Sequence, residues 1–223
     1  MENYYTARKW QLMLGFDLAA RLARKVIGAH FGKPLADLIA VEARREYESL
    51  IPQLPYIGGR QNPQTQILLS AALFLALYKA LRAQDWTVEE IGALVYEAVD
   101  STYARVPLSL CRLYGRLGFR ESSQRKVRER ARASQERRYT GDWVYSVVDG
   151  DGQGFDYGLD FEECGIWKFF QAQGAEEFAP YMCQLDYIAS DRFGWGLVRT
   201  TMIAEGGDKC DFRFHATGRT DRE

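Results

Sequence analysis

The stretch of sequence that decides the fold reads WVYSVVDGDGQGFDYGLDF and covers residues 143–161. Through residues 143–148 the side chains alternate with a period of two, which is typical of a β-strand. Residues 149–154 contain only Asp, Gly and Gln and predict a turn. Residues 155–161 predict a second strand, so we expect a small antiparallel sheet to begin here.

The residues before this stretch have helical periodicity instead. Leu14, Leu18, Leu22 and Val26 recur at every fourth position and predict an apolar stripe along a first helix. A second helix is expected to start near Pro34, since proline suits the first helical position. The residues expected to face inward from this helix are Leu35, Leu38, Ile39, Ala43, Tyr47 and Leu50.

Two further segments support a helical core. Residues 67–78 are apolar nearly all round, as in a helix at the centre of a core. Thr87 and Glu90 have the Thr-x-x-Glu spacing of a capping box, in which each residue bonds a free backbone N–H of the other. Another helix is therefore expected to start at Thr87.

Helical and strand segments alternate after residue 161. Residues 164–173 and 180–190 predict two helices. Residues 196–204 and 209–216 predict two strands joined by the Glu-Gly-Gly-Asp turn at 205–208.

The predicted fold class is therefore α+β, with a helical N-terminal half followed by a small antiparallel sheet with two helices. We expect residues 1–138 to form the helical region and residues 139–223 the α+β region, in one integrated domain.

Composition narrows the classes of partner and location. Lys and Arg number 29 against 30 Asp and Glu, so the net charge of −1 argues against nucleic acid or an anionic membrane as the main partner. The longest apolar run is shorter than the roughly 20 residues that span a bilayer, and the N-terminal residues lack the pattern of a signal peptide. Four scattered cysteines do not form a disulfide framework. We expect a cytoplasmic protein with reduced thiols.

Two charged segments invite a functional interpretation that the sequence does not favour. Residues 120–138 are strongly basic but carry almost no apolar face, so we expect a solvated connecting helix, with partner binding as the alternative. Residues 149–160 resemble a calcium loop in their oxygen spacing, but Asp160 replaces the bidentate Glu and the flanks predict strands. A polar β-turn is the better interpretation.

Three thiols are the best candidates for chemistry. Cys164 and Cys183 are both predicted in the first turn of a helix, where free backbone N–H groups lower a thiol pKa. Asp186 follows Cys183 by one turn and shares its helix face. Cys183 and Asp186 are therefore a candidate nucleophile and proton acceptor, or two metal ligands. Cys111 lies among leucines and is expected to be a core residue.

Cys210 belongs to the last predicted strand. Strand alternation places Cys210 with Phe212 and Phe214 on an apolar face. Asp211, Arg213 and His215 then share the opposite face, where they offer an acid, a guanidinium and an imidazole.

The segments that contain these cysteines resemble those of a known family. The segments at 163–166 (ECGI), 183–186 (CQLD) and 201–214 (TMIAEGGDKCDFRF) resemble the L-2-amino-thiazoline-4-carboxylic acid hydrolase family. Residues 72–91, with the capping box, look like the helical half of that family. The resemblance covers most of the chain from about Asn62 onward.

The resemblance implies a cytosolic hydrolase that acts on carbon–nitrogen bonds other than peptide bonds, opening a cyclic amidine-type thiazoline ring. It carries over Cys164, Cys183, Asp186, Cys210 and Asp211 as motif positions without identifying the nucleophile. Ring opening requires a thiolate or water to attack the carbon between sulfur and nitrogen, followed by proton delivery to the departing atom. Arg213 and His215 are candidate substrate-binding residues, with Arg213 suited to a carboxylate.

Alternatives remain open at this point. The expected partner is a small-molecule substrate without a cofactor; alternatively, Cys164, Cys183 and Cys210 bind zinc, which then activates water. A second alternative is a non-catalytic small-molecule or metal sensor that uses the same cysteines. A homo-oligomer is compatible with the sequence.

Overall fold

The computed structural model describes residues 4–150, 152 and 154–216, leaving aside the side chain of Leu22. It divides into two compact units. Unit 1 is Met1–Ala98 with Phe169–Phe178, and unit 2 is Val99–Lys168 with Ala179–Glu223. The α+β fold class is confirmed, since helices precede a small antiparallel sheet that two further helices accompany. The division into regions 1–138 and 139–223 stays a prediction.

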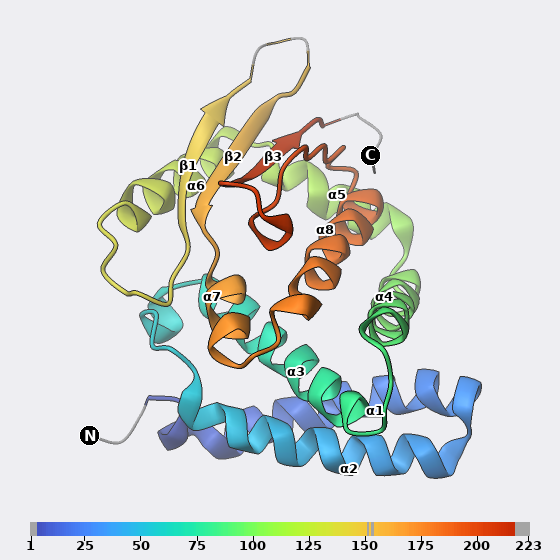
Figure 1. Cartoon of the computed structure of the whole chain (residues 1–223). Coiled ribbons are helices and arrows are strands. Elements are labelled where there is room, and N and C mark those ends of the chain that lie inside the picture. The colour runs from blue at the N-terminus through green and yellow to red at the C-terminus, as the bar shows by residue number, and fades with distance from the viewer. Residues whose placement is uncertain (1–3, 151, 153, 217–223) are drawn as a thin grey trace. The chain divides into compact units, whose positions relative to one another are not determined.

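Unit 1 is built on α1 (Lys9–Phe31), α2 (Lys33–Leu50), α3 (Gln64–Arg82) and most of α4 (Val88–Ala104). Helix α2 packs against both α1 and α3 (Figure 1). The predicted capping box is present: the Glu90 carboxylate accepts a bond from the Thr87 N–H at 2.8 Å, and the Thr87 hydroxyl accepts one from the Glu90 N–H at 3.2 Å.

Helix α3 is the central helix of unit 1, as predicted. Its inward face is fully buried at Leu68, Ala71, Leu75 and Leu81. Among the described residues, α3 is also the one helix long and apolar enough to cross a membrane. Half of that apolar window is buried inside the structure, which is the pattern of a core helix.

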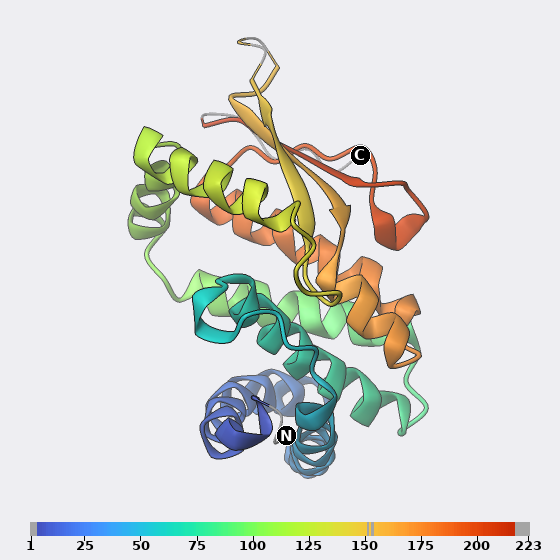
Figure 2. The same cartoon turned by 90° about the vertical axis from the view of Figure 1, so that its left-hand side faces the viewer.

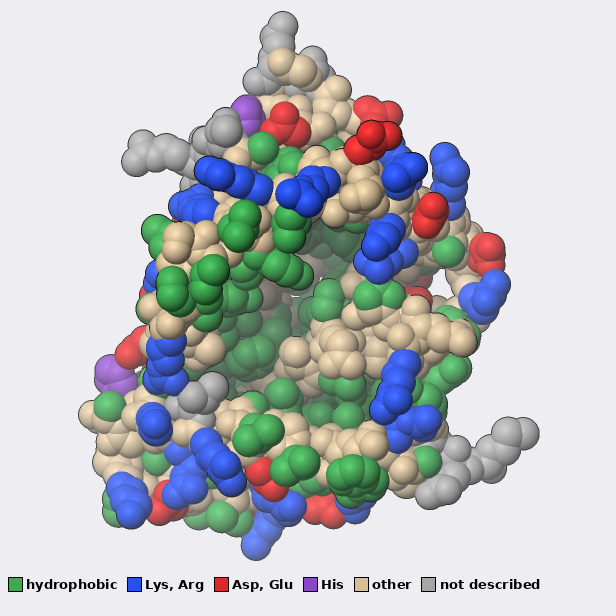
Figure 3. Space-filling view, turned by 180° about the vertical axis from the view of Figure 1, so that it is seen from behind, with side chains coloured by type: hydrophobic (Ala, Val, Ile, Leu, Met, Phe, Trp, Pro, Cys, Tyr) green, Lys and Arg blue, Asp and Glu red, His purple; other side chains and the backbone are tan. Residues whose placement is uncertain are grey.

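The predicted inward faces of the first two helices need correction. Leu14 and Leu18 are more than half exposed, and α1 instead buries Met13, Phe16 and Ile27. The Phe16 ring stacks on Tyr47 of α2 at 5.2 Å, so an aromatic contact rather than the leucine stripe sets the rotation of α1. Leu38 of α2 is also exposed, although Ile39, Ala43, Tyr47 and Leu50 are buried. Figure 3 shows hydrophobic side chains of this kind at the surface among charged ones.

Unit 2 holds the sheet and the helices around it. The strands β1 (Val144–Asp149), β2 (Tyr157–Glu163) and β3 (Cys210–Phe214) are antiparallel in the order β1-β2-β3. The helices are α5 (Leu108–Gly118), α6 (Glu121–Ser134), α8 (Ala179–Phe193) and the first half of α7 (Gly165–Ala172). Helix α5 packs closely on α8, because Gly115 lies directly against the backbone of Phe193.

The basic segment is largely exposed, as its composition predicts, but one face of it also packs on the sheet. Helix α6 packs against β1 (Figure 2) and buries Ala131. The Ser134 hydroxyl accepts a bond from the Tyr145 N–H at 3.1 Å and donates to the Ala131 carbonyl at 2.7 Å. Small residues every three or four positions give α6 a narrow face for the sheet that a search for large apolar residues overlooks.

The last predicted hairpin is also different. Residues 196–204 do not form a strand: Val198 makes an isolated bridge to Arg213, and a 3-10 turn covers Ile203–Glu205. The partner strand, β3, is present and has the predicted alternation. Of the proposed calcium-loop residues, Asp151 and Gln153 lie outside the described residues.

Candidate active site

The predicted pair Cys183 and Asp186 lies on α8 in unit 2. Cys183 is the fifth residue of α8, so it lies beyond the first turn in which the sequence predicted it. Asp186 follows at the i+3 position on the same side of the helix. The Asp186 side chain keeps 47% of its surface accessible, so a small molecule can reach it.

Arg199 is a residue of this site that sequence reasoning missed. Its Nη1 donates to Asp186 Oδ2 at 3.1 Å, and its Nη2 donates to the Cys183 carbonyl oxygen at 2.8 Å. The guanidinium lies between two rings, 4.9 Å from the centroid of Tyr187 and 4.8 Å from that of Phe212. Its side chain is only 1% exposed. A buried arginine is uncommon and would have been sought only with the fold in hand.

The segment after α8, residues 194–199, turns back along the helix and sets the position of Arg199. Gly194 and Gly196 have φ angles of +74° and +53°, which favour glycine. The Ser190 hydroxyl accepts a bond from the Leu197 N–H at 2.9 Å. Beyond Arg199, the Asp211 carboxylate accepts backbone bonds from Thr200 and Thr201 at 2.8 and 2.7 Å. The predicted site residue Asp211 therefore holds the segment that carries Arg199.

Cys164 is the residue that precedes α7, one position earlier than a first-turn thiol. Its sulfur accepts the Trp167 N–H at 3.5 Å, and its carbonyl accepts the Lys168 N–H at 3.0 Å. Cys164 thus caps the helix with its own side chain. Next to it, Gly165 leaves no room for a side chain against the Trp143 ring.

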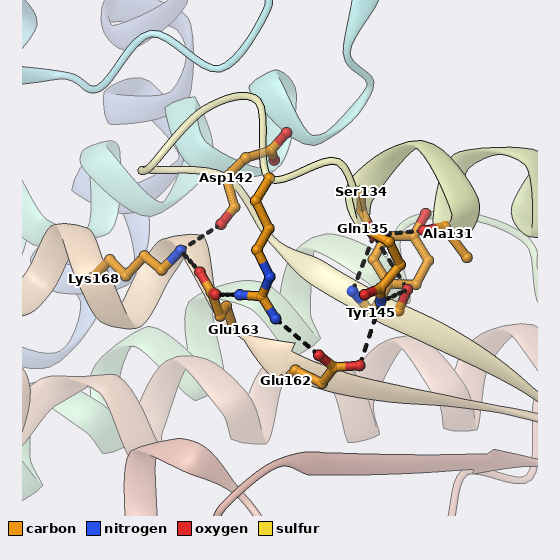
Figure 4. Close-up of polar contacts among 9 residues, drawn as sticks. Ala131, Ser134, Gln135, Asp142, Tyr145, Glu162, Glu163 and Lys168 are labelled. Atoms are coloured by element: carbon orange, nitrogen blue, oxygen red, sulfur yellow. Dashed lines mark hydrogen bonds and ion pairs between the residues drawn. The ribbon is translucent and has the colours of Figure 1, made fainter.

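An ionic clasp holds the chain on both sides of Cys164. Figure 4 shows Lys168 reaching Glu163 and the Asp142 carbonyl. Lys168 Nζ also donates to the Thr140 carbonyl at 2.9 Å. Arg137, whose φ is +48°, pairs with both Glu162 and Glu163. The clasp binds the 140–142 segment to β2 and α7.

Cys210 lies on the buried face of β3, as predicted. It is 5% exposed, and its sulfur accepts the Ile203 N–H at 3.3 Å. Phe212, on the same face, stacks against the Arg199 guanidinium. This apolar face of the sheet therefore forms one wall beside Arg199.

The three thiols and Asp186 influence one another electrostatically. Burial, then the Asp186 charge and then the Cys164 thiol raise the pKa of Cys183 well above its ordinary value. Burial raises the pKa of Cys164 to about 11, with smaller contributions from Cys210 and Asp186. The pKa of Cys210 is raised as well, again chiefly by burial.

The expected lowering of a thiol pKa by a helix N-terminus is therefore wrong for Cys164 and Cys183. Backbone N–H groups do lower the pKa of Cys164, but desolvation outweighs them. The thiols are protonated at neutral pH, and any of them needs a base to act as a nucleophile.

Asp186 is the carboxylate available to these thiols. Although its side chain is partly exposed, the protein atoms packed around it desolvate the carboxylate and raise its pKa, and the Arg199 charge and hydrogen bond oppose this effect. Burial and then the Asp186 charge also raise the pKa of the Tyr103 phenol on α4. A raised pKa makes the ionised carboxylate a stronger proton acceptor than an ordinary aspartate.

The remaining predicted residues have other partners. Arg213 Nη1 donates to Asp160 Oδ1 at 2.7 Å and to the Phe212 carbonyl at 2.9 Å. His215 Nδ1 lies 3.6 Å from Asp156 Oδ2. Strand alternation places Arg213 on the face of β3 opposite Cys210. The structure thus places Cys183 and Asp186 beside Arg199, with Cys164 and Cys210 linked to them by electrostatic interaction, and it leaves Arg213 and His215 beside other aspartates.

No metal centre emerges from the residues that the structure describes. Among them, no three His, Cys, Asp or Glu side chains converge closely enough to hold a metal ion.

Comparison with known proteins gives one positive result. The family model described as L-2-amino-thiazoline-4-carboxylic acid hydrolase matches residues 66–214, which is more than half of the chain. No curated protein and no solved structure matches. The matched residues include all three thiols of the site, Asp186 and Arg199.

Proposed function

This chain belongs to the L-2-amino-thiazoline-4-carboxylic acid hydrolase family, and from that membership we propose that it hydrolyses a small cyclic, amidine-like substrate with Cys183 as nucleophile and Asp186 as base. The bond opened is a carbon–nitrogen or carbon–sulfur bond at the ring carbon between the two heteroatoms. The observation that carries the assignment is the Cys183–Asp186 pair on one face of α8, with its carboxylate accessible.

Cys183 is favoured over the other two thiols by its hydrogen bonding. The sulfurs of Cys164 and Cys210 each accept a backbone N–H, which occupies them structurally. Among the described contacts, the Cys183 sulfur has no such donor, and Asp186 is the charged group with the largest effect on its pKa. Cys164 and Cys210 then shape the surroundings of the reacting sulfur.

The proposed reaction proceeds in two stages. Asp186 takes the Cys183 proton as the sulfur adds to the ring carbon, and the protonated carboxyl then gives this proton to the departing ring atom. The ring atom leaves but stays attached to the rest of the substrate, so the intermediate carries the whole substrate on sulfur. Water then adds to the same carbon, and Cys183 departs with a proton restored. The net change is addition of one water to the substrate.

Separate substitutions test the assignment, with 2-amino-thiazoline-4-carboxylic acid as the probe substrate. Cys183→Ala is expected to abolish turnover, and Asp186→Asn to lower kcat roughly 10²–10⁴-fold, the usual contribution of a positioned base. Cys111→Ala is the matched control, because Cys111 is a buried thiol on α5 that does not contribute to the pKa of Cys183 or Asp186. Its turnover is expected to equal that of the wild-type protein.

A second measurement identifies the nucleophile directly. Rapid quenching of the wild-type protein with substrate is expected to yield an intact mass raised by one substrate, located by peptide mapping at Cys183. Full turnover by Cys183→Ala, or an adduct at Cys210, would contradict the assignment. Binding without any turnover by the wild-type protein would favour a small-molecule sensor.

A further inference from the structure

We propose that Arg199 is the positioning residue for Asp186: it holds one carboxylate oxygen from the protein interior and leaves the other free to exchange a proton with Cys183. This inference rests on the proposed function, because it assigns a role within the same reacting pair. It concerns a residue outside the α8 motif, 13 positions after Asp186 in the chain.

The difference in exposure separates positioning from substrate binding. The Arg199 side chain is 1% exposed, whereas Asp186 is 47% exposed. A substrate can therefore reach the carboxylate but has almost no access to the guanidinium.

Three contacts fix the orientation of the guanidinium. Its Nη2 bond to the Cys183 carbonyl attaches it to the same helical turn as the nucleophile. The rings of Tyr187 and Phe212 lie close to the guanidinium carbon, at 4.9 and 4.8 Å, and restrict its plane. The carboxylate oxygen bonded to Nη1 consequently has a defined position relative to Cys183.

Maintaining this charge in the interior is costly, which is unexpected for a contact that serves stability alone. The Arg199 Nε is buried and has no hydrogen-bond partner among the described residues. An apolar side chain of similar size would avoid both the unpaired N–H and the desolvation of a cation. A functional requirement for the charge explains its presence.

The charge also governs when Asp186 can act as a base. The Asp186 charge raises the pKa of the Cys183, Cys164 and Cys210 thiols and of the Tyr103 phenol, and the pKa of Asp186 itself responds to burial and to Arg199. Arg199 is the cation among these groups. Removing its charge leaves burial unopposed, so the Asp186 pKa rises and the ionised base forms only at higher pH.

The test compares Arg199→Lys and Arg199→Met with Arg192→Met. Arg192 is a matched control, because it also bonds an aspartate in unit 2, with Nη2 at 3.2 Å from Asp100 Oδ1, and Asp100 is 49% exposed. For each protein, kcat and KM are measured as functions of pH. Independently of substrate, the Asp186 carboxyl is titrated by ¹³C NMR, with Asp186→Asn used to assign its resonance.

Arg199→Met is expected to lower kcat by roughly 10- to 100-fold with little change in KM, as for a misplaced catalytic group. The acidic limb of its pH profile and the Asp186 titration should both move to higher pH. Relative to Arg199→Met, Arg199→Lys should recover part of kcat and return the Asp186 titration most of the way to its wild-type pH. The reason is that lysine keeps the charge but not the planar geometry. Arg192→Met should show neither shift. If Arg199→Met does not fold, Arg199→Lys alone still distinguishes kcat from KM.

Two results would overturn the inference. A raised KM with unchanged kcat would make Arg199 a substrate-binding residue. An Asp186 titration that stays in place in both Arg199 variants would reduce the pair to a structural contact. Because the titration needs no substrate, it distinguishes this failure from a failure of the proposed function, in which the wild-type protein shows no turnover.

Discussion

The Asp211 carboxylate offers a sharp test of how the segment carrying Arg199 is held. Asp211 is 8% exposed and accepts three hydrogen bonds: from the Thr200 N–H at 2.8 Å, the Thr200 hydroxyl at 2.7 Å and the Thr201 N–H at 2.7 Å. Asp211→Ala removes the acceptor of all three. The Thr200 and Thr201 backbone donors then lose their partner in a partly buried position.

The magnitude follows from the number and type of these bonds. Hydrogen bonds to a charged group contribute about 1.5–3 kcal/mol each, but partial access of water to the vacated space reduces the sum. We expect Asp211→Ala to lower the free energy of unfolding by about 2–4 kcal/mol, a large share of the roughly 5–15 kcal/mol typical of a domain. Asp211→Asn keeps one acceptor oxygen and is expected to lose about half as much.

The assay is equilibrium urea unfolding followed by circular dichroism at pH 7, with Glu205→Gln, a change on the adjoining turn, as the control. A loss below about 0.5 kcal/mol for Asp211→Ala would refute the reasoning, because that is the ordinary range for surface substitutions. The stability must also depend on pH in a defined direction. Although burial alone would raise it, the hydrogen bonds from Thr200 and Thr201 lower the pKa of Asp211. Its contribution is therefore present above the unfolded pKa of about 3.9 and is lost as the pH falls through the folded value.

Three further predictions concern other parts of the chain. Thr87→Ala removes half of the capping box and is expected to lower the free energy of unfolding by about 1 kcal/mol in urea; no loss would mean that the cap is replaced by water. Gly115→Ala places a methyl group against the Phe193 carbonyl and should lower the free energy of unfolding by about 1–3 kcal/mol or more, measured as a lower thermal midpoint. Unchanged stability would show that α5 and α8 can move apart without an energetic penalty. The Cys164 thiol should ionise only near pH 11, measured as the thiolate absorbance that the wild-type protein shows and Cys164→Ser lacks. Because the folded pKa is raised, the contribution of Cys164 to stability is present below the unfolded pKa and is lost as the pH rises through the folded pKa. Ionisation below pH 9 would contradict the burial argument.

Much of the candidate site was predictable because it depends on local spacing. Cys183 and Asp186 share a helix face by virtue of being three residues apart, and Cys210 shares a strand face with Phe212 by alternation. The family resemblance selected the same segments. The sequence predicted that Arg213 would bind a substrate carboxylate, but in the structure Arg213 bonds Asp160. This partner could not be predicted from local spacing, because the two residues are 53 positions apart.

The sequence by itself determined the elements that local rules control: the capped start of α4, the core helix α3, the alternating faces of the strands and the position of Asp186 beside Cys183. These features depend on residues within a few positions of one another, so their backbone geometry is enough to place them. Only the tertiary structure decided which face of α1 is buried, that α6 packs on the sheet, and that Arg199 returns to α8. It also reversed the direction of the thiol pKa shifts, because desolvation depends on every atom that surrounds a sulfur, and most of those atoms belong to residues remote in the chain.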